Sequence, residues 1–105
     1  MNANQVIEAA KRTIQLQSES IAALAGFIGE DFVSVVDHVL QSSGRLVVSG
    51  IGKSAIIAQK LTATFNSTGT PSIFMHAADA IHGDLGMIQE KDTILLISKS
   101  GESPE

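Results

Sequence analysis

The sequence contains no cysteine, which excludes disulfide bonds and thiolate zinc sites and fits a reducing compartment. Its apolar runs are far too short to span a membrane. The amino terminus, residues 1–4, has neither the basic start nor the apolar core of a signal peptide. We therefore expect a cytoplasmic protein with no membrane partner.

Basic residues are also scarce, with 7 Lys and Arg against 11 Asp and Glu and a net charge of -4. This balance does not provide the basic surface that non-specific nucleic-acid binding requires, so no nucleic-acid partner is expected. Hydrophobic residues make up 44% of the 105 residues, and only 2 residues are proline. The composition predicts one globular domain or a part of one, and any phosphate site in it must be local.

Two helices are predicted in residues 1–43, ahead of the first strand. A helix over residues 5–27, capped by Asn4, would carry a narrow apolar stripe of isoleucines. The stripe consists of Ile7, Ile14, Ile21 and Ile28. It suits packing within the domain and contact between subunits equally well. The second helix is expected over residues 30–42 and ends before Gly44.

The rest of the chain, residues 44–105, alternates strands and helices as parallel βαβ units do. Strands are expected at residues 45–49, 72–75 and 93–98, with a helix over 54–68 between the first two. Each strand is a continuous apolar run, which is typical of parallel strands buried on both faces. Doubly wound sheets usually have five or more strands, so we expect this chain to be the N-terminal part of one larger domain.

A glycine turn joins the first strand to its helix, with the sequence Ser-Gly-Ile-Gly-Lys-Ser at residues 49–54. A strand, a glycine turn and a helix N-terminus in this order form an anion site, because backbone N–H groups and the positive end of the helix dipole point to the same place. Lys53 adds a full positive charge. The predicted ligand therefore carries a phosphate group.

Two other glycine-turn sites are possible by pattern. A Walker A loop would need its first glycine at Val47, inside the strand, so it is excluded. The dinucleotide fingerprint Gly-x-Gly-x-x-Ala is formally present at residues 50–55. The acidic residue expected at the end of the next strand is replaced by His76, although Asp79 lies just beyond. Dinucleotide binding stays open as a rival to a sugar-phosphate site.

A serine loop, Ser-Lys-Ser-Gly-Glu-Ser at residues 98–103, follows the third strand and is expected to begin another helix. Because the carboxyl ends of parallel strands meet at one edge of the sheet, this loop and the glycine turn should converge on the same anion. Three serines around one glycine exceed what a helix cap requires. The two loops together favour a sugar-phosphate site.

A histidine loop, residues 76–87, lies between the second and third strands at the same expected edge. It contains two histidines and two aspartates, which can transfer protons, bind sugar hydroxyls or ligate a metal. His38, in the second predicted helix, is expected to be an ordinary surface or packing residue.

Four motifs together resemble the sugar isomerase (SIS) domain of D-arabinose 5-phosphate isomerases. They are Gly-Ile-Gly-Lys-Ser at residues 50–54, Ser-Thr-Gly-Thr-Pro at 67–71, His-Gly-Asp-Leu-Gly at 82–86 and the serine loop extended to residue 105. The serine loop is shared by SIS domains in general, whereas the combination of the other three motifs is much more specific to this branch. The resemblance implies a three-layer αβα, flavodoxin-like fold and an aldose–ketose isomerase that interconverts D-ribulose 5-phosphate and D-arabinose 5-phosphate for Kdo biosynthesis.

The same resemblance implies site residues, a partner and a metal contact. Lys53 and Glu105 correspond to catalytic positions, and we add His82 because an imidazole can polarise a carbonyl or shuttle protons. The substrate-binding positions are Gly50, Gly52, Ser54, Gly69, Thr70, His76, His82, Ser98, Ser100, Gly101 and Ser103. No cofactor is required, and zinc at His76 is expected to be incidental or inhibitory. The expected partners are a pentose phosphate and further copies of the chain in a tetramer with shared sites.

The chain departs from the family pattern at two places, Ala-Ile-Ile at residues 55–57 in place of Gly-His-Ile, and Lys99 inside the serine loop. The resemblance also implies further catalytic residues downstream, including a glutamate and a histidine, and a paired CBS module. A regulatory SIS domain that binds phosphosugars without turnover is the alternative function.

Overall fold

The computed structural model describes residues 1–104 and divides into two compact units, Met1–Asp37 and the part from His38 onward. Glu105, one of the predicted catalytic residues, lies outside the described residues.

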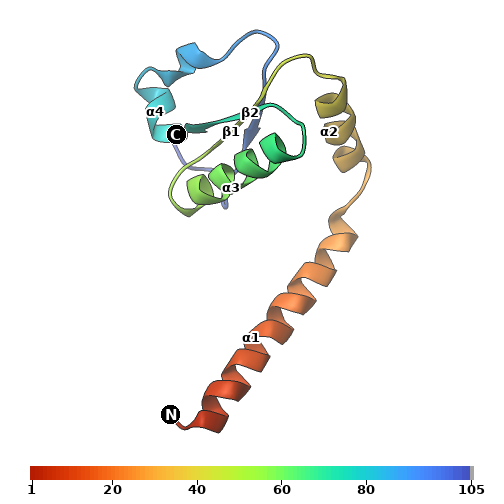
Figure 1. Ribbon diagram of the computed structural model, residues 1–105, viewed down its shortest axis with the longest axis vertical. Helices are drawn as coiled ribbons and strands as arrows, with labels where there is room; N and C mark the ends of the chain where they lie inside the picture. Colours follow the sequence, from red (N-terminus) through yellow and green to blue (C-terminus); the bar gives the residue numbers. More distant parts are fainter. Residues whose placement is uncertain (105) are drawn as a thin grey trace. The chain divides into compact units, whose positions relative to one another are not determined.

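The first unit contains the long helix α1 (Ala3–Ala23), drawn in red and orange in Figure 1. Its cap is Asn2, whose side chain accepts from the Gln5 backbone N–H while the Gln5 side chain accepts from the Asn2 N–H. The prediction of Asn4 as the cap is wrong, because this reciprocal pair satisfies two N–H groups at once. The 3-10 turn η1 (Leu24–Phe27) replaces the last predicted helical residues. No residue of α1 is buried, so the isoleucine stripe is exposed within this unit.

The second unit is built on three parallel strands in the order β2-β1-β3. The strands are β1 (Leu46–Gly50), β2 (Ser72–His76) and β3 (Thr93–Leu96). The helix α2 (Glu30–Gln41) leads into this unit, and α3 (Lys53–Ser67) connects β1 to β2. The predicted α/β fold with a parallel sheet is confirmed.

The chain moves outward from β1 to β2 and then back across β1 to β3, so right-handed crossovers place the two connections on opposite faces. Figure 1 shows α3 on one side of the strands and, on the other, α4 (Ala77–Ile81) with the turn η2 (Asp84–Met87). The predicted histidine loop is therefore partly helical. Its two short helices escaped the sequence analysis because neither is long enough to show a helical period.

The core lies around the central strand β1, all of whose residues are buried. Leu46 and Val48 pack with Ala58 of α3, and Phe74 and Leu95 from the neighbouring strands pack against this cluster. The prediction that all strands are buried on both faces fails for β3, since Leu96 is 73% exposed. β3 is an edge strand with one partner among the described residues, whereas β1 has a strand on each side.

The strands of the sheet begin at one end and finish at the other. The carboxyl edge is where the strands end, at Gly50, His76 and Leu96; the amino edge is where they begin, at Leu46, Ser72 and Thr93. Residues 98–104 leave the carboxyl edge as a bend at residues 99–101 with irregular chain on either side, so the helix expected in the serine loop does not begin within the described residues.

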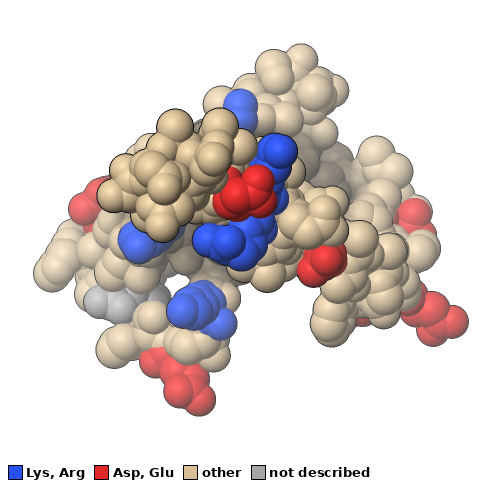
Figure 2. Space-filling model, turned by 90° about the horizontal axis from the view of Figure 1, so that it is seen from below, with Lys and Arg blue, Asp and Glu red and all other residues tan. Residues whose placement is uncertain are grey.

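The surface is mostly uncharged on the face shown in Figure 2, where Lys and Arg in blue are interrupted by Asp and Glu in red. This matches the low charge of the sequence and its excess of acidic residues. Among the described residues, no helix combines the length and apolar character needed to cross a membrane.

Candidate functional site

The glycine turn folds β1 directly into α3. Gly52 is the residue before α3 and has φ 59 and ψ -131, a conformation that residues with a Cβ rarely adopt. A Cβ on Gly50 would lie 2.9 Å from the carbonyl atoms of Ser54, so this position must also lack a side chain. The two glycines bring the N-terminus of a 15-residue helix close against the end of the central strand.

The charge at this helix start favours an anion. Lys53 is the first residue of α3 and is exposed. A cation there is unfavourable for the helix itself, because the N-terminal end of the helix dipole is already positive. A bound anion removes this conflict by interacting with both, which explains a lysine at a position where helices usually carry acidic residues.

The serine loop is ordered by its own hydroxyls. Ser98 Oγ accepts from the Gly101 N–H at 2.8 Å, and Ser100 Oγ accepts from the Glu102 N–H at 3.1 Å. A hydroxyl that accepts a hydrogen bond keeps its own O–H free to donate. Both serines can therefore donate to an anion while the loop keeps its shape.

The glycine turn and the serine loop meet at the carboxyl edge and line one open pocket of about 570 Å³. Ile97 N–H donates to Ser49 O at 2.9 Å, so the bonding between β1 and the chain after β3 continues to the start of the serine loop. The predicted site residues on the pocket wall are Gly50, Ser54, Ser98, Ser100, Gly101 and Ser103, together with Lys99. Serine hydroxyls, a lysine and a helix start around one hollow can bind a phosphate group.

Several predicted site residues are not on this pocket wall. Gly52, Lys53, His76 and His82 are absent from it, although the first three stand within a few residues of lining positions. His76 ends β2, and its Nδ1 accepts from the Ala78 N–H at 3.1 Å, which leaves Nε2 as the free ring nitrogen. His82 follows α4 and is exposed.

The described residues do not fit a zinc site by themselves. Nowhere in residues 1–104 do three or more His, Asp or Glu side chains gather as metal ligands, whereas protein zinc sites use three or four protein ligands. His76 alone offers one ring nitrogen.

Gly69 and Thr70, two further predicted substrate positions, lie at the amino edge instead. Thr70 N–H donates to Phe65 O at the end of α3, and the following Pro71 O accepts from the Leu46 N–H at 2.9 Å. This bond places the segment beside the beginning of β1, whereas the pocket lies beside its end. Within one copy of the chain, these residues and the serine loop are at opposite ends of the sheet.

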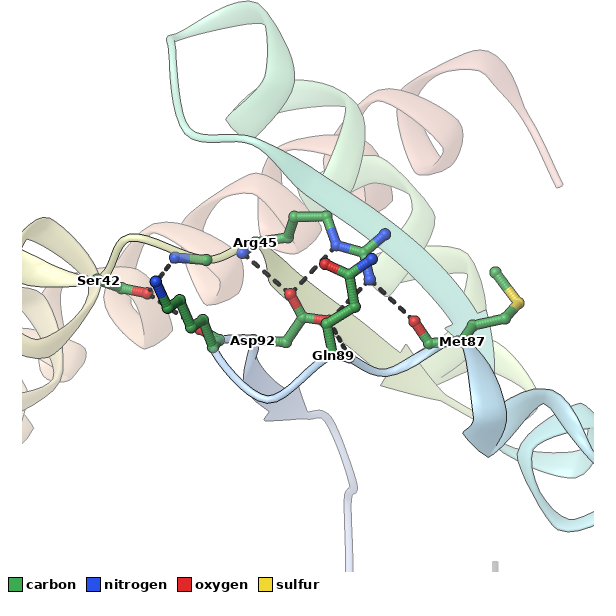
Figure 3. Close-up of polar contacts among 7 residues, drawn as sticks. Ser42, Arg45, Met87, Gln89 and Asp92 are labelled. Atoms are coloured by element: carbon green, nitrogen blue, oxygen red, sulfur yellow. Dashed lines mark hydrogen bonds and ion pairs between the residues drawn. The ribbon is translucent and has the colours of Figure 1, made fainter.

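The shortest polar contact of a side chain within residues 1–104 is an ion pair between Arg45 and Asp92 at the amino edge, which was not predicted from the sequence (Figure 3). Arg45 Nη2 lies 2.7 Å from Asp92 Oδ2, and the carboxylate is only 1% exposed. The hydrogen bonds from the Arg45 side chain, and then that from the Gln89 N–H, hold the pKa of Asp92 well below its usual range. Each partner directly precedes a strand, and parallel strands begin at one edge, so the pairing was available from the sequence.

These features define the class of protein. It is a parallel α/β domain with an open pocket at the carboxyl ends of its strands, lined by the glycine turn and the serine loop. Residues 39–105 match the family model described as the SIS domain, and the chain belongs to the SIS domain family.

The chain is similar to particular members of this family. The chain is 46% identical over 99 residues to the arabinose 5-phosphate isomerase KdsD of Pseudomonas aeruginosa, covering 94% of this chain and 30% of that protein. It is 45% identical over 100 residues to the arabinose 5-phosphate isomerase GutQ of Escherichia coli, covering 95% and 31%. A solved structure of Escherichia coli CFT073 c3406 in complex with arabinose 5-phosphate is 40% identical with a TM-score of 0.93, covering 98% of this chain and 55% of that one.

The comparisons confirm the resemblance and the SIS fold that the sequence predicted. The chain spans less than a third of the length of these two curated relatives.

Proposed function

We propose that this chain is the phosphosugar-binding part of a D-arabinose 5-phosphate isomerase, which interconverts D-ribulose 5-phosphate and D-arabinose 5-phosphate for Kdo biosynthesis. The observation that carries the proposal is the single pocket shared by the glycine turn and the serine loop. The similarity of the chain to two arabinose 5-phosphate isomerases and to a protein solved with arabinose 5-phosphate supports the choice of substrate.

The substrate phosphate binds in this pocket. The hydroxyls of Ser98 and Ser100 donate to the phosphate oxygens, because both already accept bonds from the loop backbone. The helix dipole of α3 and the side chain of Lys99 add positive potential on the pocket wall. The sugar carbon chain then extends from a fixed phosphate towards the reacting groups.

Isomerisation moves one proton between adjacent carbons without a redox cofactor. A base removes the proton from the carbon beside the carbonyl, and the electron pair forms a cis-enediol. The proton returns to the neighbouring carbon, and a hydroxyl proton passes between the two oxygens. Lys53 stabilises the negative enediolate oxygen, His82 polarises the carbonyl or carries the hydroxyl proton, and Glu105 takes part in proton transfer. An isomerisation that moves the carbonyl to the adjacent carbon by proton transfer needs neither an oxidant nor a metal.

We further propose a homo-oligomer, a tetramer, in which Gly69 and Thr70 of one copy complete the pocket of another. Their place at the amino edge supports this, since they do not reach the pocket of their own copy. The exposed isoleucine stripe of α1 supplies an apolar surface for the contact. Replacing Ile14 by Glu should lower the assembly mass measured by light scattering, and an unchanged mass would remove α1 from the interface.

We place the enzyme in the cytoplasm, because phosphorylated sugars are charged and are retained there. A small-molecule pentose phosphate is its partner, and neither nucleic acid nor membrane is needed.

The test is a coupled assay of the full-length protein that contains residues 1–105, with ribulose 5-phosphate as substrate. We expect formation of arabinose 5-phosphate, and little or none from residues 1–105 alone. Thermal stabilisation by the sugar phosphate without product would replace the isomerase by the regulatory alternative. Titration with NAD or NADP is the control for the dinucleotide hypothesis, and we expect no stabilisation from either.

A further inference from the structure

The segment that carries His82 is poorly fixed by packing. No residue of α4 or η2 is buried. Ile81, Leu85 and Met87, its large apolar side chains, are 56%, 58% and 50% exposed. Its local bonds, such as that from the His82 N–H to Asp79 O at 3.1 Å, lie within the segment and do not tie it to the sheet. Its position must therefore be set at its two ends.

The far end of the segment is held by the Arg45–Asp92 pair. Arg45 Nη2 donates to Met87 O at 2.9 Å, and the same nitrogen lies 2.7 Å from Asp92 Oδ2. Arg45 Nε donates to Asp92 Oδ1 at 3.1 Å, and the Gln89 N–H donates to Oδ2 at 2.8 Å. In Figure 3, the Arg45 guanidinium donates to the Met87 carbonyl, and the Asp92 carboxylate accepts from the Gln89 N–H.

The Arg45–Asp92 pair is attached to β1, the most buried strand of the sheet. Arg45 directly precedes the buried strand β1, its N–H donates to Asp92 Oδ1 at 3.1 Å, and its O accepts from the Thr93 N–H at 2.9 Å. Gly44 lies so close to the Lys91 carbonyl that any side chain there would overlap it. The central strand thus determines where the histidine segment ends.

We propose that Arg45 and Asp92 are positioning residues for His82, acting through the carbonyl of Met87 and the N–H of Gln89. The proposal rests on the proposed function, in which His82 meets the substrate. Neither residue lines the phosphate pocket, so their loss misplaces His82 and leaves phosphate binding intact. A misplacement of about 1 Å costs up to about 100-fold in turnover.

The experiment compares four variants of the full-length protein. Arg45→Met removes the positive charge and all side-chain donors. Arg45→Lys keeps the charge but loses the planar guanidinium that donates to three acceptors. Asp92→Asn keeps the shape of the carboxylate without its charge. Arg12→Met is the matched control, because Arg12 is the other arginine of the sequence and is exposed on α1.

We expect Arg45→Met to lower kcat about 10- to 100-fold with KM changed by less than about threefold, and Arg45→Lys to recover part of the loss. Hydrogen exchange of the amides of residues 82–89 should become faster in Arg45→Met than in Arg12→Met. Should Arg45→Met fail to fold, Arg45→Lys and Asp92→Asn carry the same comparison with smaller effects. A lower melting temperature with unchanged kcat and unchanged exchange would overturn the proposal and leave the pair a purely structural one.

A failed activity assay would test the proposed function separately from the role of Arg45. A wild-type protein that forms no arabinose 5-phosphate contradicts the isomerase assignment. The exchange experiment then still decides whether Arg45 holds the histidine segment: amide exchange equal in Arg45→Met and Arg12→Met would reject that role whatever the protein catalyses.

Discussion

The carboxyl edge and the amino edge of the sheet differ in whether their polar side chains already have hydrogen-bond partners. At the carboxyl edge, serine hydroxyls and a lysine surround an open pocket and keep donors free. At the amino edge, the Asp92 carboxylate is almost fully buried and receives bonds from Arg45 and Gln89. Binding needs polar groups without a permanent partner, whereas fixing a backbone needs polar groups that are all satisfied. The contrast separates the residues that should change ligand binding from those that should change order and stability.

The largest effect should come from Lys53→Met at the carboxyl edge. If Lys53 stabilises the enediolate as proposed, loss of its charge should lower kcat about 100- to 1,000-fold, the usual range for removing such an interaction. The melting temperature should change little, because Lys53 is exposed. Lys60→Met, on the same helix and also exposed, is the control and should keep wild-type turnover. Equal activity of the two variants would remove Lys53 from the mechanism.

A smaller effect is expected from the serine loop. Ser98→Ala and Ser100→Ala should each raise the Kd for arabinose 5-phosphate about tenfold, which corresponds to about 1.5 kcal/mol for a hydrogen bond to a charged group. Isothermal titration calorimetry measures both. Ser20→Ala, on α1, removes an exposed hydroxyl bonded to its own helix and should not change the Kd. Affinities that stay at the wild-type value would show that the phosphate binds elsewhere.

The smallest effect at neutral pH is expected from Asp92 at the amino edge. Its ionisation should make the melting temperature depend steeply on pH in acid. The pKa of Asp92 is lower in the folded protein than the unfolded value of 3.8, chiefly through the Arg45 hydrogen bonds. A lowered pKa gives stability that is complete above the unfolded value and is lost as the pH falls below it. The melting temperature should therefore fall below about pH 4. Asp92→Asn should flatten that part of the curve, and an identical acid slope in both proteins would contradict the assignment.

The strand, turn and helix around Gly52 could be predicted from the sequence, because hydrophobic period and turn chemistry are local properties. The meeting of the serine loop with the glycine turn followed from one rule, that parallel strands end at one edge. The structure places both segments on the same pocket wall.

Other features depend on contacts that a local pattern does not contain. Asn2 rather than Asn4 caps α1, because only Asn2 has Gln5 three residues later to complete the reciprocal bonds. The position of Gly69 at the amino edge follows from its place before β2, whereas the resemblance grouped it with the substrate site. The Arg45–Asp92 pair joins residues 47 positions apart, so it could be predicted only from the non-local rule that parallel strands begin at one edge.

The central claim is that each copy binds the phosphate of the sugar at its carboxyl edge, and that the Arg45–Asp92 pair at the amino edge takes no part in binding it. It is tested most directly by following the backbone amide resonances of residues 1–105 during titration with arabinose 5-phosphate. We predict saturable shifts at Gly50, Gly52, Gly101 and Glu102, with no change at Gly44 and Lys91. Shifts at Gly44 and Lys91 with none in the serine loop would contradict the account.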